Sequence, residues 1–290
     1  MTSALAEGPW WLEPLHAVLP GVVVAVAVPL LGGNYCESVR LDLVAADCEQ
    51  IVARRFPPSD VGGSSRLAEL LLSLADTSVP APTLVGVHDD VVLLEWVDGA
   101  VSVTDLAPDA EADALGGVLA VIHALPVVMA THLPAFPLLP SPRWQTRIRE
   151  TAAGAAALLR LLELPTTTPG FALIHGDFFG GNVLWADGDV AAVIDWDRAS
   201  RGSPTVDVAS CGLDLLLRHG DAARSTFYDS YFGARDRPDD LAFWELRSAT
   251  SASVGMGRPL WESYEAMRPS SLEPMVLEQR LSEELDRLVT

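Results

Sequence analysis

The stretch that decides the fold is Leu173-Ile174-His175-Gly176-Asp177-Phe178-Phe179-Gly180-Gly181-Asn182-Val183-Leu184-Trp185-Ala186-Asp187-Gly188-Asp189-Val190-Ala191-Ala192-Val193-Ile194-Asp195-Trp196-Asp197. Two apolar runs in it flank Asp187-Gly188, a dipeptide typical of the two-residue turn of a β-hairpin. Pairing outward from this turn sets Trp185 opposite Val190. The stretch therefore predicts a β-hairpin whose polar residues lie at the open end, away from the turn.

Three oxygen-bearing side chains are expected to meet at that open end. The hairpin pairing sets Asn182 near Val193, and Asp195 lies two residues further along the second strand. Because residues paired across two strands lie about 5 Å apart, Asn182 and Asp195 come within reach of one metal ion. The pair Gly180-Gly181 lets the preceding loop fold tightly, which brings Asp177 to the same place.

These residues fit the chemistry of phosphoryl transfer. Magnesium takes hard oxygen ligands, and a separate carboxylate must accept or orient the proton of the attacking hydroxyl. The spacing H-x-D-x-x-x-x-N, with an aspartate on the following strand, matches the catalytic loop of kinases and their metal-binding aspartate. Taken singly, each residue is more often a turn cap, a partner of backbone groups or a strand-end carboxylate. Together they predict a kinase site.

Periodicity divides the chain into a β-rich first part and a mostly helical second part, which is an α+β class. The expected strands are residues 22–30, 38–44, 50–56, 83–87 and 91–97, with a helix over 64–75. Helices are expected over 111–125 and 142–164, and in several segments between 204 and 289. The boundary near Asp98 gives a first lobe of residues 1–97 and a second lobe of residues 98–290.

The composition excludes some functions. The chain has no lysine, and all 19 of its basic Lys or Arg residues are arginine. A Walker loop ending in G-K-[ST] is therefore impossible, and so is a lysine Schiff base. The formal net charge of -20 disfavours binding to nucleic acid and to an anionic membrane, and it would favour a cationic substrate.

Nothing in the sequence indicates a membrane span. The longest early apolar run covers residues 22–31 and is too short for a bilayer, which needs about 20 residues. The first residues lack the basic start of a signal peptide. Cys36, Cys48 and Cys211 are scattered and odd in number, which is typical of a reducing cytoplasm. No feature of the sequence indicates an oligomeric state.

With these motifs in view, the chain resembles the aminoglycoside phosphotransferase family, whose relatives include choline and fructosamine kinases. The resemblance rests on His175-Gly176-Asp177, Asn182 and Asp195-Trp196, which match the H-G-D-x-x-x-x-N and D-W signatures. It implies a protein-kinase-like two-lobed fold and transfer of a γ-phosphate from ATP or GTP to a hydroxyl group. It also implies Asp177 as the catalytic base, Asn182 and Asp195 as Mg²⁺ ligands, and His175 as a residue that holds the loop.

The resemblance extends to the nucleotide side. The string Gly32-Gly33-Asn34 resembles the family's short loop over the phosphates. The string Glu95-Trp96-Val97 resembles the hinge whose backbone groups meet the adenine, which implies Glu95 and Val97 as nucleotide-binding residues. Gly202-Ser203-Pro204-Thr205-Val206-Asp207 resembles the family's G-D-P-x-x-D segment, with serine in place of the first aspartate. This match implies that its final aspartate braces the catalytic loop from behind.

Two departures from the family pattern lie in the first lobe. The family places a lysine on the third strand to pair with nucleotide phosphates, and here Arg54 stands at that position. Strand alternation makes Arg54 and Arg55 face opposite ways, so Arg54 either reaches the phosphates or faces solvent. The helix acid that normally pairs with the lysine is also replaced, because Leu67 takes its position and Glu69 lies on another face.

Two other functions compete with this one. A kinase fold that binds nucleotide with weak or no turnover is favoured by the missing lysine and opposed by the intact Asp177, Asn182 and Asp195. A non-haem iron dioxygenase would use His175, Asp177 and His219 as a triad of two histidines and one carboxylate. That enzyme needs a jelly roll with His219 on a strand, whereas the residues around His219 follow a helical pattern.

The sequence does not identify the phosphate acceptor beyond a small molecule with a hydroxyl group. Trp244 could line its pocket, although aromatic residues at helical spacing more often pack in a core. Four acids are candidates for binding a cationic acceptor, although solvation of the surface is the commoner role of each. These acids are Asp239, Asp240, Glu245 and Glu262.

Overall fold

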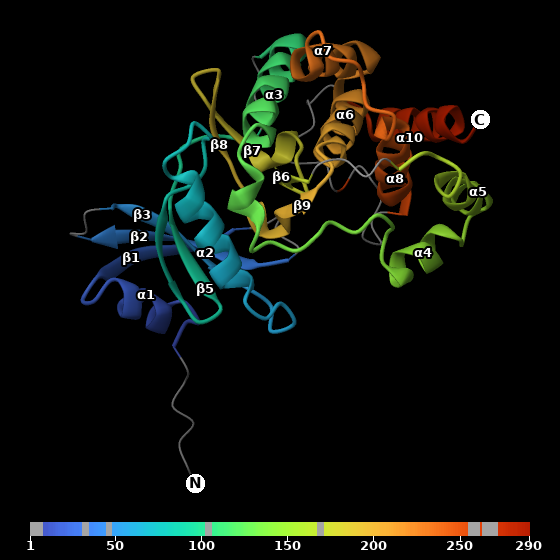
Figure 1. The fold of residues 1–290 in the computed structure, drawn as a ribbon. Helices are drawn as coiled ribbons and strands as arrows, with labels where there is room; N and C mark the ends of the chain where they lie inside the picture. The colour runs from blue at the N-terminus through green and yellow to red at the C-terminus, as the bar shows by residue number, and fades with distance from the viewer. Residues whose placement is uncertain are drawn as a thin grey trace. The chain divides into compact units, whose positions relative to one another are not determined.

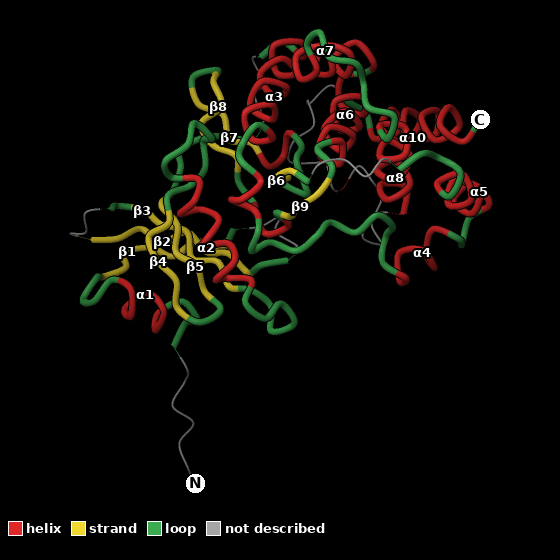
Figure 2. The backbone as a smooth tube through the Cα atoms, viewed as in Figure 1, coloured by secondary structure: helices red, strands yellow, loops and turns green. Residues whose placement is uncertain are grey.

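The computed structural model describes residues 8–30, 35–44, 48–101, 106–166, 171–254, 262 and 272–290. The chain separates into two compact units, Met1–Asp98 and Gly99–Thr290. The larger sheet belongs to the first unit, and helices dominate the second (Figures 1 and 2). The predicted α+β class, with a β-rich first part and a helical second part, is confirmed.

The first unit is built on a five-stranded antiparallel sheet with the order β1-β2-β3-β5-β4. Its elements are α1 (Leu12–Val18), β1 (Val23–Pro29), β2 (Glu37–Val44), β3 (Gln50–Arg55), α2 (Gly63–Leu74), β4 (Leu84–His88) and β5 (Val91–Glu95). The strands follow the predicted segments, because these runs are rich in valine, leucine and isoleucine, which favour the extended conformation. Helix α1 was not predicted from the sequence.

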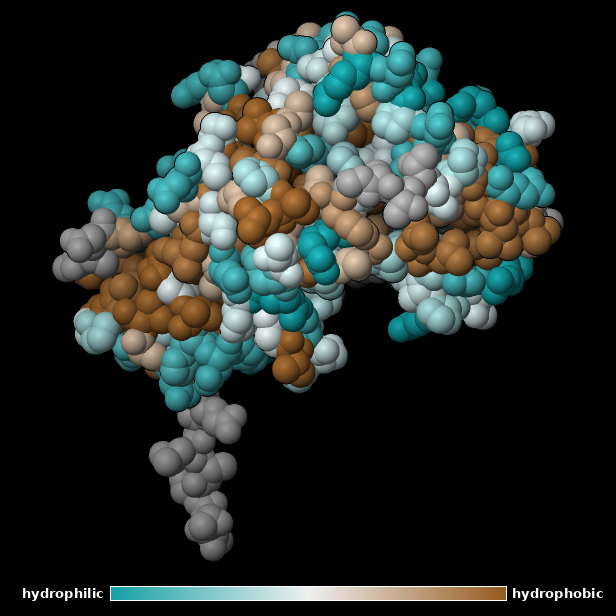
Figure 3. Space-filling view, viewed as in Figure 1, coloured by the Kyte–Doolittle hydropathy of each residue, from teal (hydrophilic) through white to brown (hydrophobic). Residues whose placement is uncertain are grey.

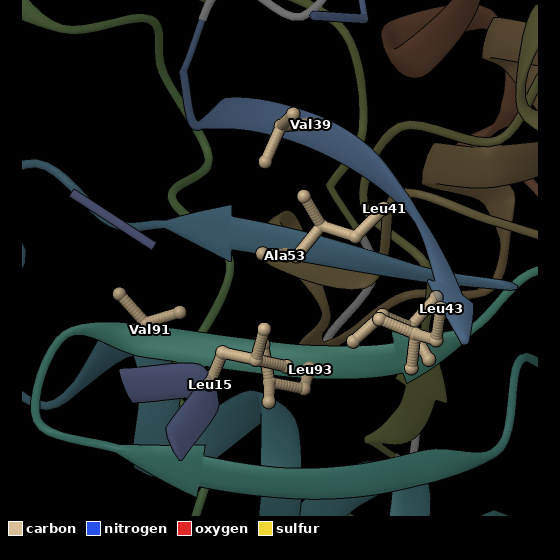
Figure 4. Close-up of a cluster of buried hydrophobic side chains, with 8 residues drawn as sticks. Leu15, Val39, Leu41, Leu43, Ala53, Val91 and Leu93 are labelled. Atoms are coloured by element: carbon tan, nitrogen blue, oxygen red, sulfur yellow. The ribbon is translucent and has the colours of Figure 1, made fainter. Parts of the chain in front are cut away.

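One face of this sheet forms a hydrophobic core with α1 (Figure 4). Leu15 of α1 packs against Leu41, Ala53 and Leu93, and each of these four side chains is fully buried. Because successive side chains of a strand point to opposite faces, this packing places Arg54 on the face away from α1.

The second unit is mostly helical, with two small two-stranded sheets, β6-β9 and β7-β8. Its helices are α3 (Pro108–His123), α4 (Pro142–Ile148), α5 (Ala152–Leu161), α6 (Thr205–His219), α7 (Asp221–Phe232), α8 (Leu241–Val254) and α10 (Pro274–Val289). Its strands are β6 (Ala172–Ile174), β7 (Val183–Ala186), β8 (Asp189–Val193) and β9 (Ser200–Gly202). Short 3-10 helices cover η1 (Val127–Ala130), η2 (Gly180–Asn182) and η3 (Trp196–Arg198).

The single helix predicted over residues 142–164 is wrong, because the chain breaks between α4 and α5. Thr151 starts the second helix by accepting a hydrogen bond from the backbone N–H of Gly154 at 3.0 Å. A Cβ at Gly154 would lie only 2.0 Å from the carbonyl oxygen of Ile148. The tight approach of the backbone therefore requires glycine at this break.

Helix α5 has apolar residues on more than one side. It buries Ala157, Leu158 and Leu161, yet Leu159 and Leu162 beside its C-terminus are exposed, and Figure 3 shows apolar surface over this helix. None of the helices within the described ranges is both long enough and apolar enough to span a bilayer.

Candidate active site

The predicted hairpin is formed by β7 and β8, and Trp185 pairs with Val190 as expected. The predicted position of Asn182 near Val193 is wrong by one residue, since Val183 pairs with Val193. The cause is a register shift between Leu184 and Trp185. Asn182 therefore lies beside Ile194, whose backbone N–H donates to the Asn182 carbonyl oxygen at 2.8 Å.

Asp195 comes directly after Ile194 in the sequence and has a left-handed backbone conformation, with φ of 65°. The other described non-glycine residues with positive φ, Asp89 and Asp187, both lie in two-residue hairpin turns, where this conformation is common. Asp195 lies at the start of η3 and has no such explanation. Strain of this kind concentrates at functional sites, because the surrounding structure must hold it.

Asp177 lies close to Asp195, within range of its negative charge. Burial raises the pKa of Asp177 above its ordinary value, the charges of Arg198 and His175 lower it, and those of Asp195 and Asp207 raise it again. The net shift is upward, so Asp177 is a stronger base than an exposed aspartate. The structure thus brings together two of the three predicted side chains, the carboxylates of Asp177 and Asp195.

Asn182 joins this cluster through the loop. Its Nδ2 donates to the backbone carbonyl oxygen of Asp177 at 2.8 Å, which leaves its side-chain oxygen as an acceptor. Asn182 and Asp195 supply hard oxygen atoms and fit Mg²⁺ in chemistry. Among the described residues, no group of three or more His, Cys, Asp or Glu side chains could hold a metal ion. An ion held here would therefore need phosphate oxygens or water as its other ligands.

Asp207, at the start of α6, fixes the segment before Asp177. Its two carboxylate oxygens accept from the backbone N–H groups of His175 at 2.7 Å and Gly176 at 2.8 Å. His123 of α3 lies 3.1 Å from the same carboxylate. The ring of His175 contacts the Ile194 carbonyl oxygen at 2.9 Å, which links the loop to the end of β8. These contacts make His175 a positioning residue of the catalytic loop.

A buried ionic network fixes the other end of the loop. The backbone N–H of Gly180 donates to Asp214 at 3.1 Å, and Asp214 also accepts from Arg218 at 2.8 Å. Arg218 donates in turn to Glu111 of α3 at 2.5 Å, and His219 contacts Glu111 at 3.0 Å. His219 is the last residue of a helix and is engaged with Glu111, so the dioxygenase hypothesis is wrong.

The residues expected to bind the nucleotide belong to the first unit. Gly32, Gly33 and Asn34 lie outside the described residues, but β1 and β2 on either side of them pair as a hairpin. Arg54 pairs with Ser38, near the start of β2, and is half-buried.

The predicted hinge residues follow β5. Glu95 is the last residue of that strand, and its backbone N–H donates to the Thr83 carbonyl oxygen at 2.9 Å. Val97 comes two residues later and is half-buried. Within the described part of the chain, no hydrogen bond engages the backbone of Val97, so its N–H and C=O remain available to a ligand.

Two of the four acids proposed for a cationic acceptor have structural roles. Asp240 is buried and accepts from Ser203 and Thr205, each at 2.9 Å, and from the Trp244 indole at 3.2 Å. Asp240 therefore supplies a carboxylate beside Ser203, which stands where the family has an aspartate. Glu245 accepts from Tyr228 at 2.7 Å.

A model of the phosphotransferase enzyme family, labelled APH, matches residues 36–244. The chain belongs to this family. It is a phosphotransferase, as the catalytic-loop motif predicted, and the suspected family is confirmed.

Three solved structures of similar fold are phosphotransferases that act on antibiotics by their names. Spectinomycin phosphotransferase, solved with ADP and spectinomycin, is 15% identical with a TM-score of 0.61, over 91% of this chain and 95% of that one. Macrolide 2′-phosphotransferase from Brachybacterium faecium is 20% identical with a TM-score of 0.61, over 94% and 96%. An aminoglycoside phosphotransferase solved with AMP-PNP and hygromycin B is 18% identical with a TM-score of 0.62, over 92% and 94%. The protein-kinase-like fold is thereby confirmed.

One curated relative differs in kind. Acyl-CoA dehydrogenase family member 10 of Mus musculus is 31% identical over 195 residues, which is 56% of this chain and 18% of that protein. The phosphotransferase chain thus spans less than a fifth of the length of this relative.

Sequence reasoning missed several residues around the site of this phosphotransferase. Arg198 could have been found, because it follows Asp195 by three residues. The i,i+4 spacing of Asp214 and Arg218 on α6 also signals an ion pair. Their partner Glu111 lies 107 residues from Arg218 in sequence, so no local pattern could reveal it.

Proposed function

We propose that this phosphotransferase transfers the γ-phosphate of ATP or GTP to a hydroxyl group of a small molecule. The observation that carries the proposal is the placement of Asp177, with its raised pKa, beside Asp195 and the loop residue Asn182. Similar folds solved with ADP or AMP-PNP support a nucleotide as the phosphate donor.

In the proposed reaction, the acceptor hydroxyl oxygen attacks the γ-phosphorus in line with the bond to the β–γ bridging oxygen. A new P–O bond to the acceptor forms, the bond to the bridging oxygen breaks, and the nucleoside diphosphate leaves with that electron pair. The hydroxyl proton passes to the carboxylate of Asp177 and from there to solvent. The products are a phosphate monoester, a nucleoside diphosphate and a proton.

The rest of the site would position these groups. When bound, Mg²⁺ would be held by Asn182 and Asp195 and would offset negative charge on the phosphate oxygens. Arg54 and the Gly32-Gly33-Asn34 loop would contact the phosphates, and the backbone at Glu95 and Val97 would meet the base. We place the reaction in the cytoplasm, where the free thiols of Cys36, Cys48 and Cys211 would stay reduced.

The test measures release of nucleoside diphosphate with Mg-ATP or Mg-GTP against a panel of hydroxyl compounds. Asp177→Asn should lower kcat by about 10²- to 10⁴-fold, the usual worth of a general base, while nucleotide binding survives. Asp189→Asn, on an exposed residue at the far end of the same hairpin, is the control and should keep full activity. A wild type that binds nucleotide without turnover of any acceptor would favour the binding-protein alternative, which the absence of lysine supports.

A further inference from the structure

Two arginines of the second unit, Arg198 and Arg247, lie within range of each other's charge, and the buried Nε of Arg247 has no hydrogen-bond partner among the described residues. We propose that they form a subsite for an anionic group of the acceptor, so that the hydroxyl compound phosphorylated here is an acid, such as a hydroxycarboxylate. The inference rests on the proposed function, because it takes the anion to be part of the acceptor. It replaces the cationic acceptor that the net charge of the chain would favour.

Arg247 of α8 has an unusual environment for a guanidinium group. Its Cζ lies 5.0 Å from the ring centre of Phe136 and 5.1 Å from that of Trp244. One nitrogen, Nη2, donates to the carbonyl oxygen of Pro137 at 3.1 Å, whereas the buried Nε has no hydrogen-bond partner among the residues described. Arg247 is thus held in place by two aromatic rings with part of its donor capacity unused.

Arg198 lies beside the catalytic loop, and its charge acts on Arg247. It follows Asp195 by three residues and is exposed, and its backbone packs against Gly176, the residue before Asp177. A Cβ at Gly176 would lie 2.2 Å from the carbonyl oxygen of Arg198. The charge of Arg198 also lowers the pKa of Asp177, so the positive group lies within electrostatic range of the base.

Strand β9 connects the surroundings of the two arginines, Arg198 and Arg247. β9 begins two residues after Arg198. The backbone carbonyl oxygen of Arg201, in β9, accepts a hydrogen bond from the Phe136 backbone N–H at 2.8 Å. Phe136 also borders Gly202, where a Cβ would lie 3.1 Å from the Phe136 Cβ. The aromatic partner of Arg247 is therefore anchored on the segment that carries Arg198.

The electrostatics favour an anion at this place. Burial and the charge of Arg198 lower the pKa of Arg247 to about 10, so Arg247 remains charged at neutral pH and is repelled by Arg198. A carboxylate can accept two parallel hydrogen bonds from a guanidinium and would relieve this repulsion, whereas a cationic group would increase it.

The first experiment measures binding by calorimetry at low salt. The probes are hydroxycarboxylates of increasing chain length, glycerol 3-phosphate, and for each acid the matched hydroxyamide and amino alcohol. We expect an anionic probe to bind at least tenfold more tightly than its neutral and cationic counterparts, as charge-assisted hydrogen bonds require. The carboxylate and phosphate probes distinguish which anion fits.

Variants test whether Arg198 and Arg247 cause the tighter binding of the anionic probe. Arg247→Ala and Arg198→Ala should each weaken the anionic probe by tenfold or more, and Arg247→Lys should retain part of the affinity because it keeps the charge. Arg237→Ala is the matched control, because Arg237 also lies over an aromatic ring, at 4.9 Å from Tyr228, but in another part of the unit. Arg198 is exposed, so its variant tests the subsite even if Arg247→Ala fails to fold.

Turnover separates this inference from the proposed function. Phosphorylation of the acid in preference to its amide and amine supports both. Phosphorylation of amino alcohols or amino sugars without acids overturns the anionic subsite and leaves the proposed function intact. Binding of acids that depends on Arg247, without nucleoside diphosphate release, supports the subsite and contradicts the proposed function. Equal binding of acid, amide and amine overturns the subsite.

Discussion

The backbone N–H of Gly180 donates a hydrogen bond to the carboxylate of Asp214, with 3.1 Å between the nitrogen and Oδ2. Through this bond the loop between Asp177 and Asn182 rests on a buried charge network that joins α6 to α3. An ion pair at this depth contributes little net stability by itself, but breaking it leaves an uncompensated buried charge. The network therefore holds the loop in one geometry.

Gly180→Ala should disturb this geometry. The added Cβ would lie 2.5 Å from Nη2 of Arg218 and 3.1 Å from Oδ2 of Asp214, so the loop or the network must move. Displacement of a catalytic group by about 1 Å costs about 10²-fold in rate, and we expect a fall in kcat of that order with a smaller change in KM for nucleotide. Steady-state kinetics measure both.

Gly117→Ala is the control for that variant. Gly117 lies within α3, and no atom approaches the position of its Cβ within 4 Å. Alanine in a helix interior is more stable than glycine by about 0.5–1 kcal/mol, so this variant should raise Tm and keep full activity. Equal kcat in the two variants would show that Gly180 does not position the loop.

The same network predicts a pH dependence of stability. Burial would raise the pKa of Glu111, but hydrogen bonds from His219 and Arg218 and their positive charges lower it from 4.5 to about 2. Since the folded-state pKa is depressed, the stabilisation is complete above about pH 5 and is lost as the pH falls toward 2. The shift corresponds to about 3 kcal/mol at neutral pH.

Glu111→Gln should remove this effect, because glutamine does not titrate. The variant should be less stable than the wild type by about 3–5 kcal/mol at pH 7, since it leaves Arg218 partly uncompensated. Its free energy of unfolding should also fall less steeply between pH 5 and 2. Urea unfolding across this range measures both, and parallel curves for the two proteins would contradict the assignment.

Metal-dependent nucleotide binding tests Asp195. Asp195→Asn removes the negative charge while keeping a residue type that tolerates a left-handed backbone. We expect the affinity for Mg-ATP to fall by about tenfold or more, while ATP binding in EDTA stays unchanged. Calorimetry with Asp189→Asn as the control gives the comparison, and an unaltered Mg-ATP affinity would remove Asp195 from the metal site.

The parts of the fold that local patterns specify were predictable. The Asp187-Gly188 turn and the apolar runs beside it located the hairpin, because the turn type depends on those two residues. The register at Asn182 was not predictable, since the shift between Leu184 and Trp185 leaves no clear mark in the sequence.

Long-range contacts account for most of what the sequence did not reveal. The pairing of Glu111 with Arg218 and the contact of Arg247 with Phe136 both join residues separated by more than a hundred positions. Periodicity reports which face of an element is apolar, and it carries no information on which distant side chain meets that face. The contacts on which the proposed subsite for an anionic group rests are therefore visible only in the folded chain.

The last prediction concerns Arg54 and Arg55, neighbours on β3 that face opposite sides of the sheet. Arg55 lies on the side of α1, with its Cζ 4.8 Å from the ring centre of Trp10 and an ion pair to Glu37. Arg54 lies on the other side, opposite Val92 of β5. If Arg54 contacts the nucleotide phosphates, Arg54→Ala should raise KM for nucleotide and lower kcat, because positive charge there favours binding and the transition state.

Arg55→Ala should change activity little, because an exposed ion pair contributes only about 0–1 kcal/mol. Arg54→Lys distinguishes two forms of the phosphate role. Activity is largely kept if the site needs only a positive charge, and it falls if the site depends on the two parallel hydrogen bonds of a guanidinium. Steady-state kinetics of the three variants decide between these outcomes. Wild-type kinetics in Arg54→Ala would show that Arg54 does not contact the phosphates, and the nucleotide would then have to be held without the residue that stands in the family's lysine position.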